Sequence, residues 1–140
     1  MRFFVGTSGY SYPEWKGRFY PENLSPKKML SYYAQKFAMV EVNYTFRALP
    51  SEKVVMSWIQ ETPEWFRFVL KAHKAITHDR RLKDVQEQTD RLIHAASALK
   101  DRLGPILYQF PPGFQKDVAR LRAFFELVDG RAVSAFEFRH

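Results

Sequence analysis

The feature of this sequence that most limits its fold is a regular alternation of short apolar runs with longer amphipathic stretches. The apolar runs cover residues 3–7, 39–43, 66–72, 105–110 and 133–138. Between them, apolar residues recur at helical spacing. Because strands that alternate with helices pair in parallel, the pattern predicts an α/β protein with five strands and four helices.

The four predicted helices begin near residues 25, 51, 84 and 117. Ser25 is a suitable N-cap, and Pro26 fits the first turn because a helix leaves the N–H at that position unpaired. Gly130 is a typical terminator for the last helix. Helical spacing predicts these core-facing side chains: Met29, Leu30, Tyr33, Phe37, Val54, Val55, Trp58, Ile59, Val85, Leu92, Ile93, Ala96, Leu99, Val118, Leu121, Phe125 and Val128.

Composition narrows the class of protein. The 140 residues are 46% hydrophobic and 16% aromatic, which is enough to build a folded core. The absence of cysteine excludes a disulfide framework, a thiolate nucleophile and a cysteine zinc site. No apolar run reaches the roughly 18 residues of a membrane span, and the run at 3–5 is too short for a signal peptide. We therefore expect a cytoplasmic protein without a membrane partner, and its net charge of +7 favours anionic ligands.

The strand and helix pattern fits two architectures. A doubly wound sheet would be complete at this size, whereas an eight-stranded barrel needs about 250 residues and would be only half present. The last predicted strand has no helix after it. Because a parallel strand is normally covered on both faces, this absence favours the half barrel.

Polar side chains gather where the predicted strands end, and both architectures bind ligands at that edge. Charged groups in an apolar strand need partners or a ligand, because burying them alone costs several kcal/mol. The alternatives are a layer of ion pairs, Glu41 with Lys71 or Glu137 with Arg139, and a functional site. The candidate residues at strand ends are Thr7, Ser8, Glu41, Asn43, Lys71, His73, Gln109, Glu137, Arg139 and His140.

Two further segments border these strand ends. The first loop carries Tyr10 and Trp15, which could stack on a base or a sugar or could simply pack as a plug over the sheet. The segment 71–83 holds many basic side chains, which either clamp a phosphate or form a solvated stretch before the next helix. The nearby His and Glu residues could bind a divalent metal, although no pair has the spacing of a zinc motif.

The motifs together resemble one family, the YecE-like proteins, known as domain of unknown function family 72. The matching stretches are 6–15, 19–21, 40–46, 68–72, 76–78, 103–112 and 135–140. Tyr10 stands where the family commonly has Trp, and Arg47 stands where an aromatic residue is frequent. The resemblance implies a TIM-type (β/α) barrel. Family members continue for roughly another hundred residues, so residues 1–140 are expected to be the N-terminal part of one barrel domain, cut after the fifth strand and prone to self-association.

Three functions remain open from the sequence. The first is a metal-assisted enzyme acting on a phosphorylated or nucleic-acid substrate, by analogy with other barrels. In it, Lys71 and Arg139 hold phosphate. Glu41 or Glu137 is the general base, and His73 or His140 is a proton carrier or a metal ligand. The remaining site residues, Thr7, Ser8, Tyr10, Trp15, Asn43 and Gln109, would bind the substrate.

The other two functions use the same residues differently. A nucleic-acid binding module without catalysis would place phosphates on the basic segment and stack bases on Tyr10 and Trp15. A glycoside hydrolase would use Glu41 and Glu137 as its paired carboxylates.

Overall fold

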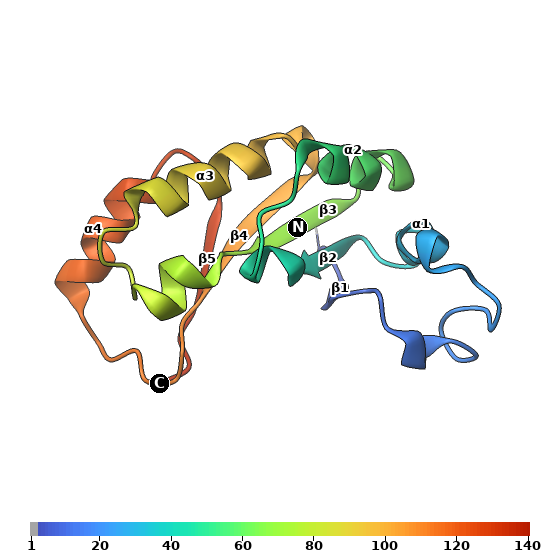
Figure 1. Ribbon diagram of the computed structural model, residues 1–140, viewed down its shortest axis with the longest axis horizontal. Coiled ribbons are helices and arrows are strands. Elements are labelled where there is room, and N and C mark those ends of the chain that lie inside the picture. The colour runs from blue at the N-terminus through green and yellow to red at the C-terminus, as the bar shows by residue number, and fades with distance from the viewer. Residues whose placement is uncertain (1–2) are drawn as a thin grey trace.

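The computed structural model describes residues 3–140, which form one parallel sheet with helices along it (Figure 1). The strands are β1 (Gly6–Ser8), β2 (Met39–Val42), β3 (Arg67–Lys71), β4 (Leu103–Gln109) and β5 (Ser134–Glu137). The helices are α1 (Met29–Tyr33), α2 (Glu52–Glu61), α3 (Gln86–Ser97) and α4 (Val118–Val128). The strands lie in sequence order, β1-β2-β3-β4-β5, and every neighbouring pair is parallel. The predicted α/β class with five strands and four helices is therefore confirmed.

The helices cover one face of the sheet. Phe68 and Leu70 of β3 are fully buried, whereas Lys71 is partly exposed. The Phe68 ring stacks 5.6 Å from that of Trp58 on α2, and the ring of Tyr108 on β4 lies 5.0 Å from Phe124 on α4. Because side chains alternate along a strand, the polar residues of β3 and β4 project from the opposite, uncovered face.

Strand β4 begins two residues earlier than predicted, and it contains a proline. Phe68 pairs with Leu103, but Leu70 pairs with Ile106, so the register shifts between these two pairs. Pro105 lies within that irregularity. A proline has no N–H to donate, and a bulge is one of the few places in a sheet that tolerates it.

The ends of α4 lie where the sequence predicts them, but two of the residues predicted to face the core do not. Asp117 caps the helix by accepting from the Arg120 N–H at 3.0 Å, and Gly130 follows it with φ +66°. The predicted inward positions Val118 and Phe125 are wrong, since they are 56% and 42% exposed. The helix turns Phe124 onto Tyr108 instead, which places Phe125 beside Phe136 at the margin of β5.

The start of the first helix also differs from the prediction. Ser25 precedes a short 3-10 turn, Pro26–Lys28, and its side chain makes no capping hydrogen bond there. The α-helical part starts only at Met29. Met29, Leu30 and Tyr33 are nevertheless buried as expected.

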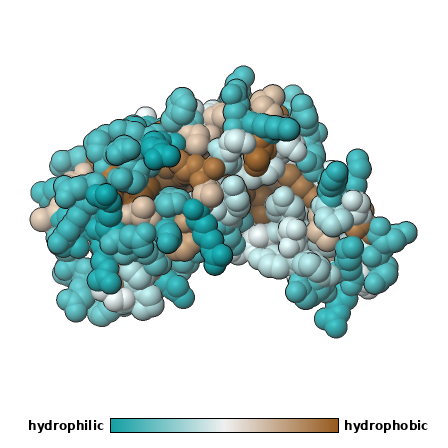
Figure 2. Space-filling view, in the orientation of Figure 1, coloured by the Kyte–Doolittle hydropathy of each residue, from teal (hydrophilic) through white to brown (hydrophobic). Residues whose placement is uncertain are grey.

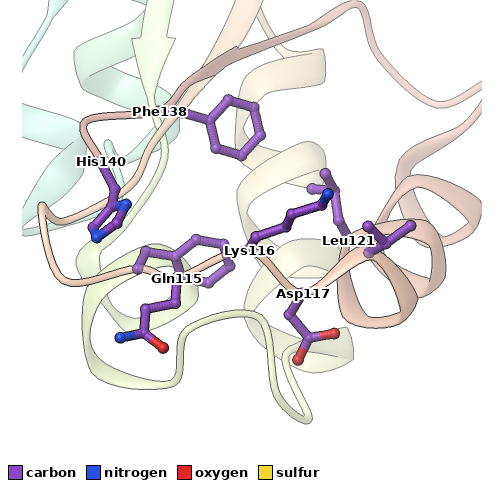
Figure 3. A pocket seen from close by; sticks show the side chains of 8 residues that line it. Gln115, Lys116, Asp117, Leu121, Phe138 and His140 are labelled. Atoms are coloured by element: carbon purple, nitrogen blue, oxygen red, sulfur yellow. The ribbon is translucent and has the colours of Figure 1, made fainter.

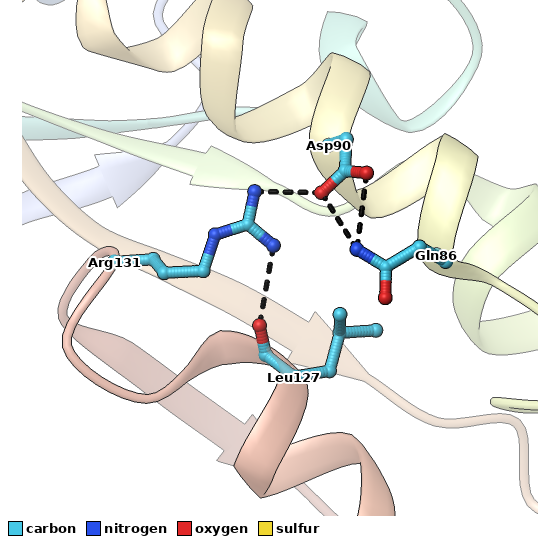
Figure 4. A network of polar contacts seen from close by, with 4 residues as sticks. All are labelled: Gln86, Asp90, Leu127 and Arg131. Carbon is cyan, nitrogen blue, oxygen red and sulfur yellow. Dashed lines mark hydrogen bonds and ion pairs between the residues drawn. The ribbon is translucent and has the colours of Figure 1, made fainter.

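An ion pair joins α3 to the end of α4 (Figure 4). Arg131 Nη2 lies 2.7 Å from Asp90 Oδ1, and Arg131 Nη1 donates to the Leu127 carbonyl at 3.2 Å. Gln86 Nε2 donates to both Asp90 carboxylate oxygens at 3.0 Å. The hydrogen bonds to Asp90 lower the pKa of its carboxyl group, and the bond from Gln86 has the largest effect, followed by that from Arg131. The contact fixes the chain just before β5 and thereby helps to place that strand.

Among residues 3–140, no helix combines the length and the hydrophobicity needed to cross a bilayer. The surface in Figure 2 is mostly hydrophilic, with a recess of apolar and weakly polar residues beneath α2.

The close pairing of β1 with β2 depends on Gly6. A Cβ at this position would lie 1.9 Å from the Met39 carbonyl oxygen, which belongs to the backbone of the neighbouring strand. We predict that Gly6→Ala lowers the free energy of unfolding by roughly 1–3 kcal/mol, the usual cost of overpacking. Urea denaturation measures the change. Gly113→Ala is the control, because nothing lies within 4 Å of its Cβ position; equal effects of the two substitutions would contradict the prediction.

Candidate functional site

The uncovered face of the sheet carries polar side chains at the carboxyl ends of all five strands. Register places Ser8 beside Glu41 and Gln109 beside Glu137, with Lys71 on the strand between these pairs. The predicted gathering of polar residues at strand ends is thus present, and it divides into two carboxylate clusters with a cationic region between them.

The first carboxylate cluster lies on β1 and β2. Ser8 Oγ donates to Glu41 Oε1 at 2.8 Å, and Asn43 Nδ2 donates to Ser8 Oγ at 2.9 Å. Within residues 3–140, Glu41 Oε2 and Asn43 Oδ1 have no protein donor. The cluster therefore presents two oxygen acceptors to a ligand.

The second carboxylate cluster lies on β4 and β5. Gln109 Nε2 donates to Glu137 Oε2 at 2.8 Å. Arg139 Nε lies 3.8 Å from the other carboxylate oxygen, Glu137 Oε1. About half of each of these ion-pair side chains is exposed, so the Arg139 guanidinium remains accessible to an anion.

The cationic region surrounds His78. Lys71 Nζ lies 5.1 Å from the centre of the Phe46 ring, and that ring meets His78 edge-on at 4.9 Å. Burial lowers the pKa of His78, and the charge of Lys71 lowers it further. Asp79 acts in the opposite direction, and Arg139 and Arg81 add smaller lowering effects. His78 is therefore a neutral imidazole near pH 7, with a ring nitrogen 2.8 Å from Thr77 Oγ1.

The segment 71–83, predicted as a basic loop, has more structure than expected. Residues Ala75–Asp79 form a π-helical turn, and Ile76 and Thr77 within it are buried. Arg81 and Leu82 follow with positive φ angles of 49° and 67°. This fixed turn is what brings His78 to the strand ends, and sequence reasoning did not select His78 among the site residues. Its only signal there was its position in the basic segment and in the 76–78 motif.

His73 lies near the strand ends, but both of its ring nitrogens form hydrogen bonds with backbone groups. The Ala75 N–H donates to His73 Nδ1 at 3.2 Å. Nδ1 is therefore the acceptor, and Nε2 carries the hydrogen that reaches the Arg47 carbonyl at 3.0 Å. With both nitrogens engaged, His73 is arranged to join the two loops that follow β2 and β3.

His140 faces a hollow that the residues of the two clusters do not line. It lines a hollow of about 330 Å³ together with Phe114, Leu121 and Phe138 (Figure 3). Lys116 extends toward Leu121 in the same view. The structure thus places His140 beside an apolar surface at the start of α4.

Two of the predicted binding residues take part in packing. Thr7 Oγ1 donates to the Gly9 carbonyl at 2.6 Å, and the Thr7 N–H donates to Tyr33 Oη at 2.7 Å. Trp15 packs against Tyr12 and other aromatic rings of the first loop at 4.7 to 6.0 Å. Thr7 therefore joins β1 to α1, and Trp15 supports the loop from behind.

A hollow of about 470 Å³ adjoins the first carboxylate cluster, beneath α2. Tyr10 and Tyr12 line one side and Val54 and Trp58 of α2 line another. The remaining lining residues are Gly9, Ser11, Glu41, Val42, Asn43 and Tyr44. Burial, with a smaller contribution from Glu61, raises the pKa of Tyr10, so its hydroxyl stays protonated and can donate a hydrogen bond.

The arrangement of possible metal ligands is sparse. Across the described part of the chain, no three His, Asp or Glu side chains come close enough together to hold a metal ion. Glu41 and Glu137 lie in separate clusters, on β2 and β5. The divalent metal considered from the sequence therefore finds no ready set of ligands among residues 3–140.

Comparison with known proteins places the chain in a family. The model of a family described as "Protein of unknown function DUF72" matches residues 4–140. UPF0759 protein YunF of Bacillus subtilis is 29% identical over 130 residues, covering 86% of this chain and 46% of that protein. UPF0759 protein YecE of Escherichia coli K12 is 29% identical over 138 residues, covering 98% of this chain and 48% of that protein. The chain thus spans about half the length of these relatives.

Solved structures agree with this assignment. A DUF72 family protein from Thermotoga maritima superimposes with a TM-score of 0.81 at 33% identity, over 98% of this chain and 55% of the other. A DUF72 family protein from Enterococcus faecalis, at 23% identity, shares the fold with a TM-score of 0.68 over 78% of this chain and 42% of the other. The YecE-like resemblance is thereby confirmed, and the chain belongs to the DUF72 family of proteins of unknown function.

Proposed function

We propose that this chain binds the phosphate group of a phosphorylated ligand at the carboxyl ends of β3 and β5 and promotes proton transfer there. The observation that carries the proposal is the position of two cations at the strand ends: Lys71 lies over the Phe46 ring, which contacts His78, and Arg139 is about half exposed beside Glu137. The charges of both, and that of Arg81, lower the pKa of His78. Cations gathered around a neutral group, with few acidic partners, are suited to an anion that supplies the missing negative charge.

Each residue has a role in this proposal. Lys71, positioned over the Phe46 ring, and Arg139, positioned by Glu137, hold the phosphoryl oxygens. His78 serves as the proton carrier in place of His73, whose nitrogens are engaged by the backbone. The general base is Glu41 or Glu137, as the sequence suggested, and both are oriented by a hydrogen bond from a neighbouring strand.

The proposal also assigns the sheet to a TIM-type barrel. Strands in sequence order, parallel pairing throughout and helices on a single face all support this architecture. In such barrels the site lies at the carboxyl ends of the strands, where the polar residues of this chain gather.

The glycosidase alternative has less support. Paired carboxylates of glycosidases act together on one glycosidic bond, roughly 5 to 9.5 Å apart. Glu41 and Glu137 lie in separate clusters on β2 and β5, and each is held by a hydrogen bond from its own neighbour, Ser8 or Gln109.

Phosphate binding is the first test. We predict that Lys71→Gln and Arg139→Gln each weaken binding of inorganic phosphate roughly tenfold, since each removes a charge-assisted hydrogen bond. Isothermal titration calorimetry at constant ionic strength measures the affinity. Lys53→Gln, an exposed lysine on α2, is the control with the same charge change. Equal affinities for all four proteins would contradict the proposal.

The pKa of His78 provides a second test. Without ligand, burial and the surrounding cations keep this pKa below the ordinary value of about 6.5. A phosphate bound among Lys71, Arg81 and Arg139 adds negative charge, which favours the protonated imidazole and raises the pKa. We predict this increase in histidine NMR titrations with and without phosphate, and no comparable change for His94 on the exposed side of α3. A His78 pKa that phosphate leaves unchanged would place the anion elsewhere.

A second proposal concerns self-association. Among residues 3–140, each of the outer strands, β1 and β5, pairs on one side only, and Val133 beside β5 is 72% exposed. Open strand edges with apolar neighbours favour pairing with another chain.

Sedimentation velocity tests this second proposal. We predict an oligomer for the native chain that Val133→Lys shifts toward monomer, because a lysine at an edge disfavours strand addition. Met56→Lys is the control, since Met56 is a similarly apolar residue, 46% exposed, on α2. A native chain that stays monomeric at every concentration would refute self-association.

A further inference from the structure

We infer that the phosphorylated ligand of this site is a sugar phosphate, whose ring occupies the hollow formed by Tyr10, Tyr12 and α2. The hollow adjoins the first carboxylate cluster, because Glu41 and Asn43 belong to both. The inference rests on the proposed function for the position of the phosphate. It adds that the phosphate is attached to a sugar.

The aromatic wall of the hollow is held rigid from behind. The Tyr12 hydroxyl donates to the Ser8 carbonyl, and the Tyr12 ring lies 4.7 Å from that of Trp15. The Tyr10 carbonyl accepts from the buried Tyr20 hydroxyl at 2.5 Å, and the Tyr10 ring lies 6.1 Å from that of Tyr33. Because these rings are already ordered, a flat ligand can pack against them with little further loss of side-chain entropy.

Trp58 closes the opposite side of the hollow. It is only 8% exposed and is stacked on Phe68 of β3, so it presents a fixed apolar surface. The space of about 470 Å³ between the walls is of the size that small-molecule sites have in general. Walls of this kind suit the C–H faces of a sugar ring, which are apolar.

The polar end of the hollow selects for hydroxyl groups. Ser8 donates its only hydroxyl hydrogen to Glu41 Oε1, and Asn43 directs its amide N–H at Ser8 Oγ. What remains for a ligand is Glu41 Oε2 and Asn43 Oδ1, and both are acceptors. A ligand that satisfies them must donate hydrogen bonds, and adjacent sugar hydroxyls do so in pairs.

The hollow and the cationic region lie close enough for one small molecule. Glu41 pairs with Val69, which places it one strand away from Lys71 and two residues behind it along the strand direction. That offset corresponds to about 8 Å between the two Cα atoms. A sugar with its hydroxyls on Glu41 can therefore present its phosphate to Lys71.

The test compares ligands that differ in one feature at a time. Calorimetry on the full chain would use inorganic phosphate, a panel of hexose 6-phosphates and pentose 5-phosphates, and cyclohexylmethyl phosphate, which keeps the shape of a hexose phosphate but lacks its hydroxyls. We expect at least one sugar phosphate to bind roughly tenfold tighter than both inorganic phosphate and the cyclohexyl compound. A tenfold gain in affinity corresponds to about one charge-assisted hydrogen bond.

Variants locate the ring. Tyr12→Leu should reduce the affinity for that sugar phosphate roughly tenfold while leaving the affinity for inorganic phosphate unchanged. Asn43→Leu should do the same and provides a second, independent variant. Tyr32→Leu is the matched control, because Tyr32 is also a partly buried tyrosine and lies outside the hollow.

The outcomes separate this inference from the proposed function. The inference is overturned if no sugar phosphate exceeds inorganic phosphate, if the cyclohexyl compound binds as well as the best sugar, or if Tyr12→Leu and Tyr32→Leu behave alike. It is also overturned if adenosine 5′-monophosphate or a single-stranded oligonucleotide binds tighter than every sugar phosphate, which would assign the hollow to a base. Loss of phosphate binding in Lys71→Gln tests the proposed function alone, because Lys71 does not line the hollow.

Discussion

The parallel hydrogen-bonded ladder from β1 to β5 is the constraint on which the other features of the structure depend. Its alternation sends Phe68, Leu70, Ile106 and Tyr108 toward the helices, where they are completely buried. Hydrophobic burial on that face drives the assembly of the sheet, because each such side chain contributes on the order of 1.5–3 kcal/mol. The same alternation places Val69 and Leu107 on the other face, together with the polar residues at its carboxyl end, Lys71 and Gln109. The core and the candidate site therefore lie on opposite faces of the same sheet.

Electrostatics divide the polar face into complementary regions. The carboxylates on β2 and β5 are each oriented by a hydrogen bond from a neighbouring strand, Glu41 by Ser8 and Glu137 by Gln109. The region between them is cationic, and burial together with these charges lowers the pKa of His78. The sugar phosphate that we propose would meet both regions, with its hydroxyls on Glu41 and its phosphate on the cations.

The differences between prediction and structure have physical causes. Helical spacing predicts that one side of a helix is apolar, but it does not fix which residue lies at the middle of the buried side. In α4 the contact of Phe124 with Tyr108 sets the buried side, and Val118 and Phe125 are left exposed. The two histidines of the basic segment look equivalent in sequence. A π-helical turn, stabilised by burial of Ile76, directs His78 to the strand ends, while backbone partners engage His73.

The sequence by itself determined the order of strands and helices, the polar character of the strand ends and the family, because these depend on local periodicity and on motifs. It could not determine which polar groups meet, since that depends on strand register and on the path of loops through space. Tertiary structure decided that Ser8, Glu41 and Asn43 form one cluster although more than thirty residues separate Ser8 from the other two. It also decided that Tyr10 and Tyr12 line a hollow while Trp15 supports them, because packing among aromatic rings depends on neighbours that are distant in the chain.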